Sequence, residues 1–139
     1  SLVRDFVDRV KVFDWASRVG FDFEIDSTEL SVYGKESCWV HFKIFNRGLP
    51  YVKLRGVRFV VPAGFEGFCS DEGVSIRGSD VLFRDVVLYE SPRAPYSFVF
   101  SVRLEAKSRG VFEYSPFLDF EYEGEVISIH YKTVKIVVR

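Results

Sequence analysis

The chain of 139 residues contains no methionine and no glutamine, and Asn46 is its only asparagine. Charged residues nevertheless make up 28% of it. Because amides deamidate and methionine oxidises at high temperature, this combination is typical of proteins from thermophiles. We therefore expect a thermophilic and archaeal source. Since position 1 is serine, we also expect that the chain begins after processing or is a segment of a longer protein.

The chain also has no excess of charge of one sign and no long apolar run. The 19 basic and 20 acidic residues leave a net charge of −1, which supplies no field for holding a phosphate backbone. No run in these residues approaches the roughly 18 apolar residues of a membrane span, and no stretch of them has the pattern of a signal peptide. We expect a protein partner or self-association, including a homodimer, with no nucleic acid. Any membrane contact is expected only through a tether outside these residues.

Residues that carry catalysis or bind metals are scarce. His41 and His130 are the only histidines and do not have the spacing of a metal site. No serine lies in a G-x-S-x-G elbow, and GFEGF at 64–68 lacks the lysine of a phosphate-binding loop. We therefore predict that the protein is not an enzyme and has no catalytic residues, no metal site and no cofactor.

Acidic residues gather toward the C-terminus, alternating along one expected strand: Glu113, Asp119, Glu121, Glu123 and Glu125. Pairing with Lys132 and Lys135 on the next strand explains them more simply than calcium binding does. A calcium-dependent or carbohydrate-binding module remains a third hypothesis.

Two cysteines allow a single pairing, Cys38 with Cys69. Cys38 alternates in phase with the apolar positions of its strand, which predicts that it faces the core. Two buried free thiols are the simpler interpretation, because free cysteine is among the most buried residue types. A disulfide is the alternative, and it would require an oxidising compartment or a hyperthermophilic cytosol.

The abundant residues are aromatic and branched. Fifteen Phe, seven Tyr and many Val favour pleated, half-buried surfaces. From Phe21 onward the apolar residues recur with a period of two between turn signals, which predicts seven or eight strands. The fold class we predict is all-β, an immunoglobulin-like antiparallel β-sandwich with a short N-terminal helix. Residues 1–19 would form a helical or extended lead-in segment, and residues 20–139 the sandwich.

Three local features of the expected sandwich can be predicted. The stretch NRGLP would be a turn between adjacent antiparallel strands, because Asn46 and Gly48 accept the left-handed backbone conformation. Gly56 in the middle of the next strand indicates a bulge or bend. The apolar phase of the final strand shifts near Lys132 and Thr133, which indicates one extra residue there.

The segment 2–16 has helical spacing, with one apolar stripe: Leu2, Val3, Phe6, Val7, Val10 and Phe13. We expect a short helix that docks on the sandwich or continues from a segment upstream, with an extended conformation as the alternative.

Trp39, His41 and Phe45 share the face of their strand that is opposite to the core positions. Exposed aromatic residues gathered together mark interfaces more often than enzymatic sites. These three are therefore the candidate partner-binding residues, and the alternative is that residues 2–16 or a loop covers them.

KESCWVHFKIFNRGLPYVKLRGVRFVVPAGFEGF resembles the core of archaeal and bacterial immunoglobulin-like domains of the CARDB and surface-layer type. YSFVFSVRLEAKSRGVFEYSPFLDFEY is similar to their paired late strands. The order N-x-G-x-P, P-x-G, S-R-G-V-F also resembles the β-sandwich before a von Willebrand-type domain in uncharacterised membrane proteins, although DFEYEGEV stands here in place of their D-P-F-G-L-like step.

The resemblance covers about residues 20–138 and carries over no functional residue. It implies a non-catalytic, membrane-tethered extracytoplasmic module that binds or scaffolds proteins in cell-surface or appendage assembly, the archaeal motility stator being one variant. The alternative is a soluble intracellular or viral structural protein that homo-oligomerises through sheet edges, with TVKIVVR as an unpaired final strand.

Overall fold

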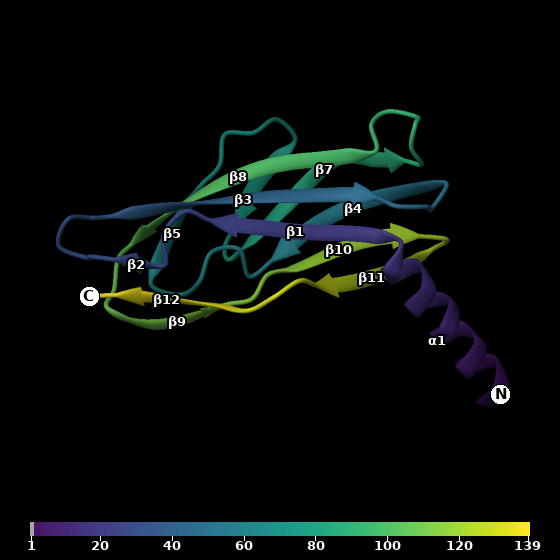
Figure 1. Ribbon diagram of the computed structural model, residues 1–139, viewed down its shortest axis with the longest axis horizontal. Helices are drawn as coiled ribbons and strands as arrows, with labels where there is room; N and C mark the ends of the chain where they lie inside the picture. Colours follow the sequence, from purple (N-terminus) through teal and green to yellow (C-terminus); the bar gives the residue numbers. More distant parts are fainter. Residues whose placement is uncertain (1) are drawn as a thin grey trace.

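In the computed structural model, which describes residues 2–139, one helix precedes twelve strands (Figure 1). The elements are α1 (Leu2–Ser17), β1 (Val19–Ile25), β2 (Glu29–Leu30), β3 (Ser37–Asn46), β4 (Tyr51–Arg58), β5 (Phe65–Phe68), β6 (Val74–Arg77), β7 (Asp80–Tyr89), β8 (Ser97–Ala106), β9 (Gly110–Tyr114), β10 (Phe117–Tyr122), β11 (Glu125–His130) and β12 (Val134–Val138). The all-β class with one N-terminal helix is confirmed.

The strands form three sheets, in the orders β1-β3-β8-β5, β11-β10-β4-β7-β6 and β2-β12-β9. All pairs are antiparallel except β12 with β2. Only residues 115–116 separate β9 from β10, and only residues 131–133 separate β11 from β12. The second and third sheets are therefore connected by two continuous lengths of chain, and the predicted irregularity at Lys132 and Thr133 lies at one of these joints.

Aromatic rings join the sheets across the core. Phe23 of β1 meets Tyr114 of β9 edge to face at 5.6 Å, and Phe83 of β7 meets Phe100 of β8 at 5.3 Å. Phe65 and Phe112 connect β5 to β9 at 5.0 Å. Such pairs add to the stability that comes from burying apolar area, since edge-to-face rings attract electrostatically.

The NRGLP stretch differs from its prediction in two ways. Strand β3 belongs to the first sheet and β4 to the second, so the loop crosses between sheets and does not connect adjacent strands. Neither Asn46 nor Gly48 has a positive φ. The buried Asn46 side chain instead accepts hydrogen bonds from Gly48 N and Leu49 N at 3.1 and 2.9 Å and donates to Leu49 O at 2.7 Å.

The irregularity predicted at Gly56 is confirmed, because the β4 register shifts between Leu54 and Gly56 against both neighbouring strands. A Cβ atom at Gly56 would lie 2.2 Å from the carbonyl oxygen of Val81. Strand β7 therefore approaches more closely than any side chain at this position permits.

Candidate partner-binding surfaces

Successive side chains of β3 point alternately into the core and to the surface. Its inward side chains are at most 1% exposed: Cys38, Val40, Phe42 and Ile44. Trp39 between them is 42% exposed, and His41 is also exposed. The strand is paired on both edges, with β1 and β8, so its outward side chains stand on a backbone fixed by two ladders.

Trp39 has apolar and aromatic neighbours on this outer surface that sequence analysis did not identify. It lies opposite Arg103 of β8, which lies opposite Phe68 of β5. The Arg103 guanidinium is 4.2 Å from the centre of the Phe68 ring. Trp39 also stacks on His41 with the ring centres 6.3 Å apart. With the exposed Val99, these side chains form one surface, which we call the aromatic face: Trp39, His41, Phe68, Val99 and Arg103.

Hydrogen bonds hold the aromatic face in place. The Trp39 amide donates to the Asp26 carboxylate at 2.9 Å, and His41 Nδ1 lies 2.7 Å from Ser101 Oγ. Ser101 N donates in turn to Asp71 Oδ2 at 2.8 Å. Two shallow grooves of about 450 and 500 Å³ lie on the face, one beside His41 and one beside Trp39. A partner would therefore meet a pre-formed surface.

Phe45 does not join Trp39 and His41. It lies six residues from Trp39 along β3, which is roughly 20 Å at the rise of a strand. Its half-buried ring covers Gly20, where an added Cβ would lie 2.2 Å from the ring, and the Arg47 guanidinium lies 4.7 Å from the ring centre. The structure therefore divides the three candidate residues into the pair Trp39 and His41 and a separate Phe45.

Helix α1 does not cover the aromatic face. It packs against β11 and β1, and its ring contact is Trp15 with Tyr122 of β10, at 4.9 Å. In Figure 1 the helix leads away from the sandwich at the lower right. The alternative that residues 2–16 cover Trp39 and His41 is therefore wrong, because the helix leaves from the other end of β1.

Both cysteines are free thiols in this structure, Cys38 buried and Cys69 half-buried. Burial raises the pKa of the Cys38 thiol to about 11. Burial also raises the pKa of Cys69, whose Sγ lies 3.7 Å from Asp71 Oδ2. Both thiols are held in the protonated, unreactive form at neutral pH.

Each histidine contacts a serine. Ser115 Oγ lies 2.6 Å from His130 Nε2, in addition to the contact between His41 and Ser101. Acyl transfer requires an orienting group and an oxyanion site as well as such a pair. The pair of His41 and Ser101 connects β3 to β8, and the pair of His130 and Ser115 connects the end of β11 to the joint between β9 and β10. Across residues 2–139 no three His, Cys, Asp or Glu side chains are grouped as metal ligands, and no helix is long and apolar enough to cross a membrane.

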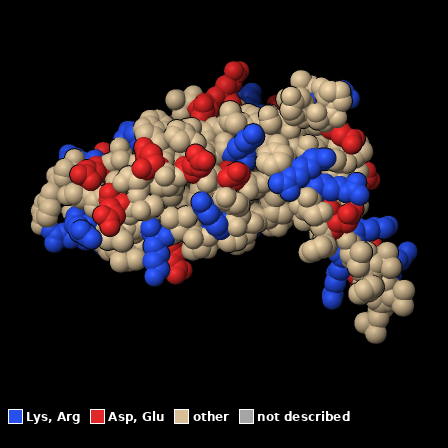
Figure 2. Space-filling model, in the orientation of Figure 1, with Lys and Arg blue, Asp and Glu red and all other residues tan. Residues whose placement is uncertain are grey.

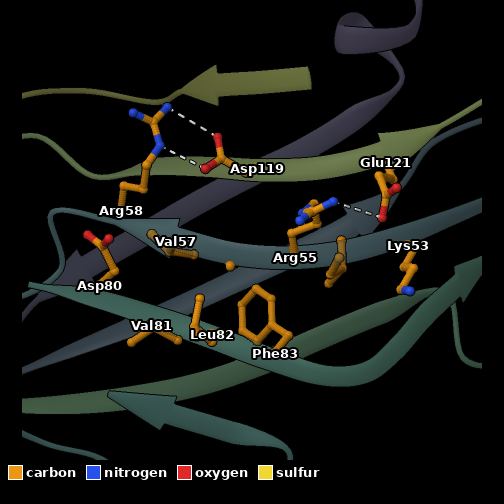
Figure 3. Close-up of a pocket in the computed structure, with 12 residues that line it drawn as sticks. Lys53, Arg55, Val57, Arg58, Asp80, Val81, Leu82, Phe83, Asp119 and Glu121 are labelled. Atoms are coloured by element: carbon orange, nitrogen blue, oxygen red, sulfur yellow. Dashed lines mark hydrogen bonds and ion pairs between the residues drawn. The ribbon is translucent and has the colours of Figure 1, made fainter. Parts of the chain in front are cut away.

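A charged groove of about 440 Å³ lies over Gly56 on the outer surface of β4, β7 and β10 (Figure 3). Arg58 makes a two-pronged contact with Asp119 at 2.7 and 3.1 Å, and Arg55 pairs with Glu121 at 3.3 Å. The hydrogen bonds that Arg58 donates to Asp119 raise the pKa of Arg58 above its ordinary value. An external anion would have to displace these carboxylates from the arginines. The opposite charges in the groove therefore neutralise one another and do not favour anion binding.

These ion pairs correct the expected pairing of the acidic strand. Asp119 and Glu121 bind arginines of β4, because β10 lies between β4 and β11. Lys135 does lie opposite Glu113 in the β9–β12 ladder. Lys132 instead lies 5.6 Å from the centre of the Phe23 ring.

A third surface is an apolar groove of about 700 Å³ beside β9. The pairing of β4 with β10 ends at Arg58 and Phe117, and Phe59 then has a φ of 61°, which turns the chain away. Strand β9 pairs only with β12, so its other edge faces the groove. Apolar side chains predominate in its lining: Phe59, Val61, Pro62, Ala63, Val111, Phe112 and Phe117.

No family model and no curated protein sequence matches the chain. Among solved structures, the Vibrio cholerae VesB protease matches with a TM-score of 0.53 and 19% identity, over 96% of this chain and 34% of that chain. A PapD-like domain of human CEP192 (PapD-like domain 7) matches with a TM-score of 0.45 and 11% identity, over 84% of each chain. The chain spans about a third of the protease's length, and at 19% identity the likeness concerns the β-sandwich fold alone.

Proposed function

We propose that this domain is a non-catalytic protein-binding module and that its partner docks on the aromatic face. The observation that carries the proposal is the grouping of Trp39, Phe68 and Arg103 on neighbouring strands, with Trp39 42% and Phe68 37% exposed. Tryptophan and arginine are the residue types that most often dominate binding energy at interfaces. Because the two flanking ladders already order these side chains, binding would lose little conformational entropy.

The wider setting we propose is a membrane-tethered extracytoplasmic module of a thermophilic archaeon, acting in cell-surface or appendage assembly. The resemblance to CARDB and surface-layer domains and the amide-poor composition support it. The alternative is a soluble intracellular or viral structural protein. Its expected template, an unpaired final strand, is reduced, because β12 pairs with β9 along one edge and with β2 at Val137 and Val138 on the other.

Photo-crosslinking in the source cell tests the proposal. A benzophenone amino acid at Val99, on the aromatic face, should give one dominant crosslinked protein that mass spectrometry identifies. The same residue at Val126, a valine of similar exposure (54% against 64% for Val99) on edge strand β11, is the matched control.

The identified protein is then purified and titrated against the Trp39→Ala and Val126→Ala variants. We expect Trp39→Ala to weaken binding by about tenfold or more and Val126→Ala to leave it unchanged. Equal crosslinking from both positions, or full affinity of Trp39→Ala, would reject the aromatic face as the docking site.

A second candidate function is the capture of an extended peptide by strand addition. The open β9 edge supplies unpaired backbone groups, and the adjoining groove can take apolar side chains from the added strand. Phe59 favours this function, because a bulky residue at positive φ is strained and such strain clusters at functional sites. Its amide is held by Asp80 Oδ1 at 3.1 Å, so the turn that opens the groove is anchored.

Selection from a displayed library of random heptapeptides tests this candidate. We expect the selected peptides to alternate apolar and polar residues, and to lose binding to Val111→Glu but not to Val126→Glu. Selected peptides that bind Val111→Glu as well as the original chain would show that the groove is not their site.

A further inference from the structure

The apolar stripe of α1 is left uncovered by the sandwich. Four residues of this stripe, Val3, Phe6, Val10 and Phe13, have side chains that are between 51% and 77% exposed. Six apolar side chains in a row along one side of a helix are costly to leave in water. Figure 2 shows the protruding helix at the lower right with a largely uncharged end.

The helix has a second, separate apolar side, and that side is the one that docks. Val12, Trp15 and Ala16 are half-buried against the sandwich. At 100° per residue they project from nearly the opposite side to Phe6 and Val10. The contact with the sandwich therefore leaves the stripe accessible along its whole length.

The spacing of the stripe is that of a coiled-coil seam. Val3 and Val10 take position a of a heptad, and Phe6 and Phe13 take position d, at intervals of three, four and three residues. We propose that α1 pairs in parallel and in register with α1 of a second copy of this chain, so that the protein forms a homodimer through its N-terminal helix. This inference is independent of the aromatic face.

The charged residues beside the seam favour a parallel over an antiparallel arrangement of the two helices. In a parallel pair, position g of one helix meets position e five residues later in the other, which joins Arg9 to Asp14 of the second copy and Leu2 to its Val7. Asp14 already binds Arg18 of its own chain through Oδ2, at 3.2 Å, and its side chain is half exposed. An antiparallel pair would instead place the two Arg9 residues opposite each other.

The charge of the helix also argues against a lipid surface as the occupant. Residues 2–17 contain three basic and three acidic side chains. Helices that lie on anionic membranes carry an excess of lysine and arginine on the polar side. Equal numbers of basic and acidic residues, with Arg9 placed to pair with Asp14 of another helix, fit a second copy of the chain better than a lipid surface.

The size of the seam predicts a reversible dimer. A helix of 16 residues is roughly 24 Å long, and two such helices bury less than the ~1,200 Å² of a standard stable interface. We therefore expect the mass in sedimentation velocity to rise from monomer toward dimer as the chain concentration increases through the micromolar range.

Alanine variants test the seam. Phe6→Ala should weaken the dimer by about tenfold or more. Lys11→Ala, at a position outside the seam, should leave it unchanged. Because alanine favours helix more than either original residue, circular dichroism should show no loss of helix in either variant. Equal effects of the two variants would overturn the proposal.

A charge exchange tests the orientation. Arg9→Asp and Asp14→Arg should each weaken the dimer, and the double variant should recover affinity relative to Asp14→Arg. In a Cys69→Ser background, Val10→Cys should form a disulfide-linked dimer under mild oxidation, because equivalent a positions face each other only in a parallel pair.

Crosslinking only in a mixture of Val10→Cys and Phe6→Cys would show antiparallel pairing and overturn the stated geometry. A monomer at every concentration would overturn the dimer itself. A monomer that binds vesicles of phosphatidylcholine and phosphatidylglycerol would assign the stripe to lipid instead.

Discussion

Replacing Asn46 by alanine should destabilise the sandwich strongly, although the residue is only the last one of β3. The backbone bond from Asn46 N to Tyr96 O, at 2.9 Å, does not depend on the side chain and is retained. What is lost is the side-chain amide, which pairs both the N–H and the C=O of Leu49. Leu49 is 1% exposed, so water does not replace these bonds.

Leaving a buried backbone group unpaired costs about 1–3 kcal/mol. Two such groups, the N–H and the C=O of Leu49, are affected. Gly48 is half-exposed, so its N–H can donate a hydrogen bond to water instead. We therefore expect Asn46→Ala to lower the free energy of unfolding by about 2–6 kcal/mol. With an unfolding entropy of about 2.1 cal/mol/K per residue, this lowers Tm by roughly 7–20 °C.

The assay is chemical denaturation with guanidinium chloride, followed by tryptophan fluorescence, with thermal unfolding as a second measure. Arg47→Ala is the matched control, since Arg47 is the exposed neighbour and its backbone bond to Arg18 O is kept. The control should stay within about 1 kcal/mol of the original chain. A loss below about 1 kcal/mol for Asn46→Ala would refute the reasoning, because it would mean that the Leu49 groups find other partners.

Three further predictions concern stability. Trp39→Ala should change the free energy of unfolding by less than about 1 kcal/mol, and a larger loss in denaturation would show that Trp39 belongs to the core. Tyr114→Phe should be neutral or stabilise by up to about 1 kcal/mol in the same assay, because the buried Tyr114 hydroxyl has no partner; clear destabilisation would reveal an unseen one. Burial raises the pKa of Cys38 from about 9 to about 11, so stability should be full below pH 9 and fall by roughly 2–3 kcal/mol as the pH rises to 11. Denaturation from pH 8 to 11 should show a smaller fall in Cys38→Ala than in the original chain; the remaining fall comes from Tyr114, whose pKa burial also raises.

The elements that sequence analysis identified are those with a strong period. The alternation of β3 and the helical spacing of α1 repeat over nine residues or more, and both are found in the structure. Strand β5 was not expected, because its four residues, FEGF, include a glycine and do not alternate between apolar and polar types, although their burial does alternate. The left-handed turn predicted at Asn46 was wrong because turn residues have two uses, a permissive backbone and a bonding side chain, and the sequence does not say which applies.

Sequence analysis identified only those residues of the aromatic face that lie on one strand with a regular period. Trp39 and His41 were identified because they alternate against core residues within one strand. Phe68 and Arg103 join them only through the registers of β5, β8 and β3, which span 35 residues of sequence between Phe68 and Arg103 alone. One local signal was available: Val99 is an apolar residue at an outward position of β8, and it is 64% exposed.

Whether a face is covered depends on connections as well as on periodicity. Only Arg18 lies between α1 and β1, so the helix has no length of chain with which to turn back over the outer surface of β3. Arg18 is also fixed: its amide donates to Trp15 O at 3.0 Å, its carbonyl accepts from Arg47 N at 2.7 Å, and its side chain binds Asp14. The direction of α1 is therefore set by this joint, which leaves both the aromatic face and the helix stripe exposed.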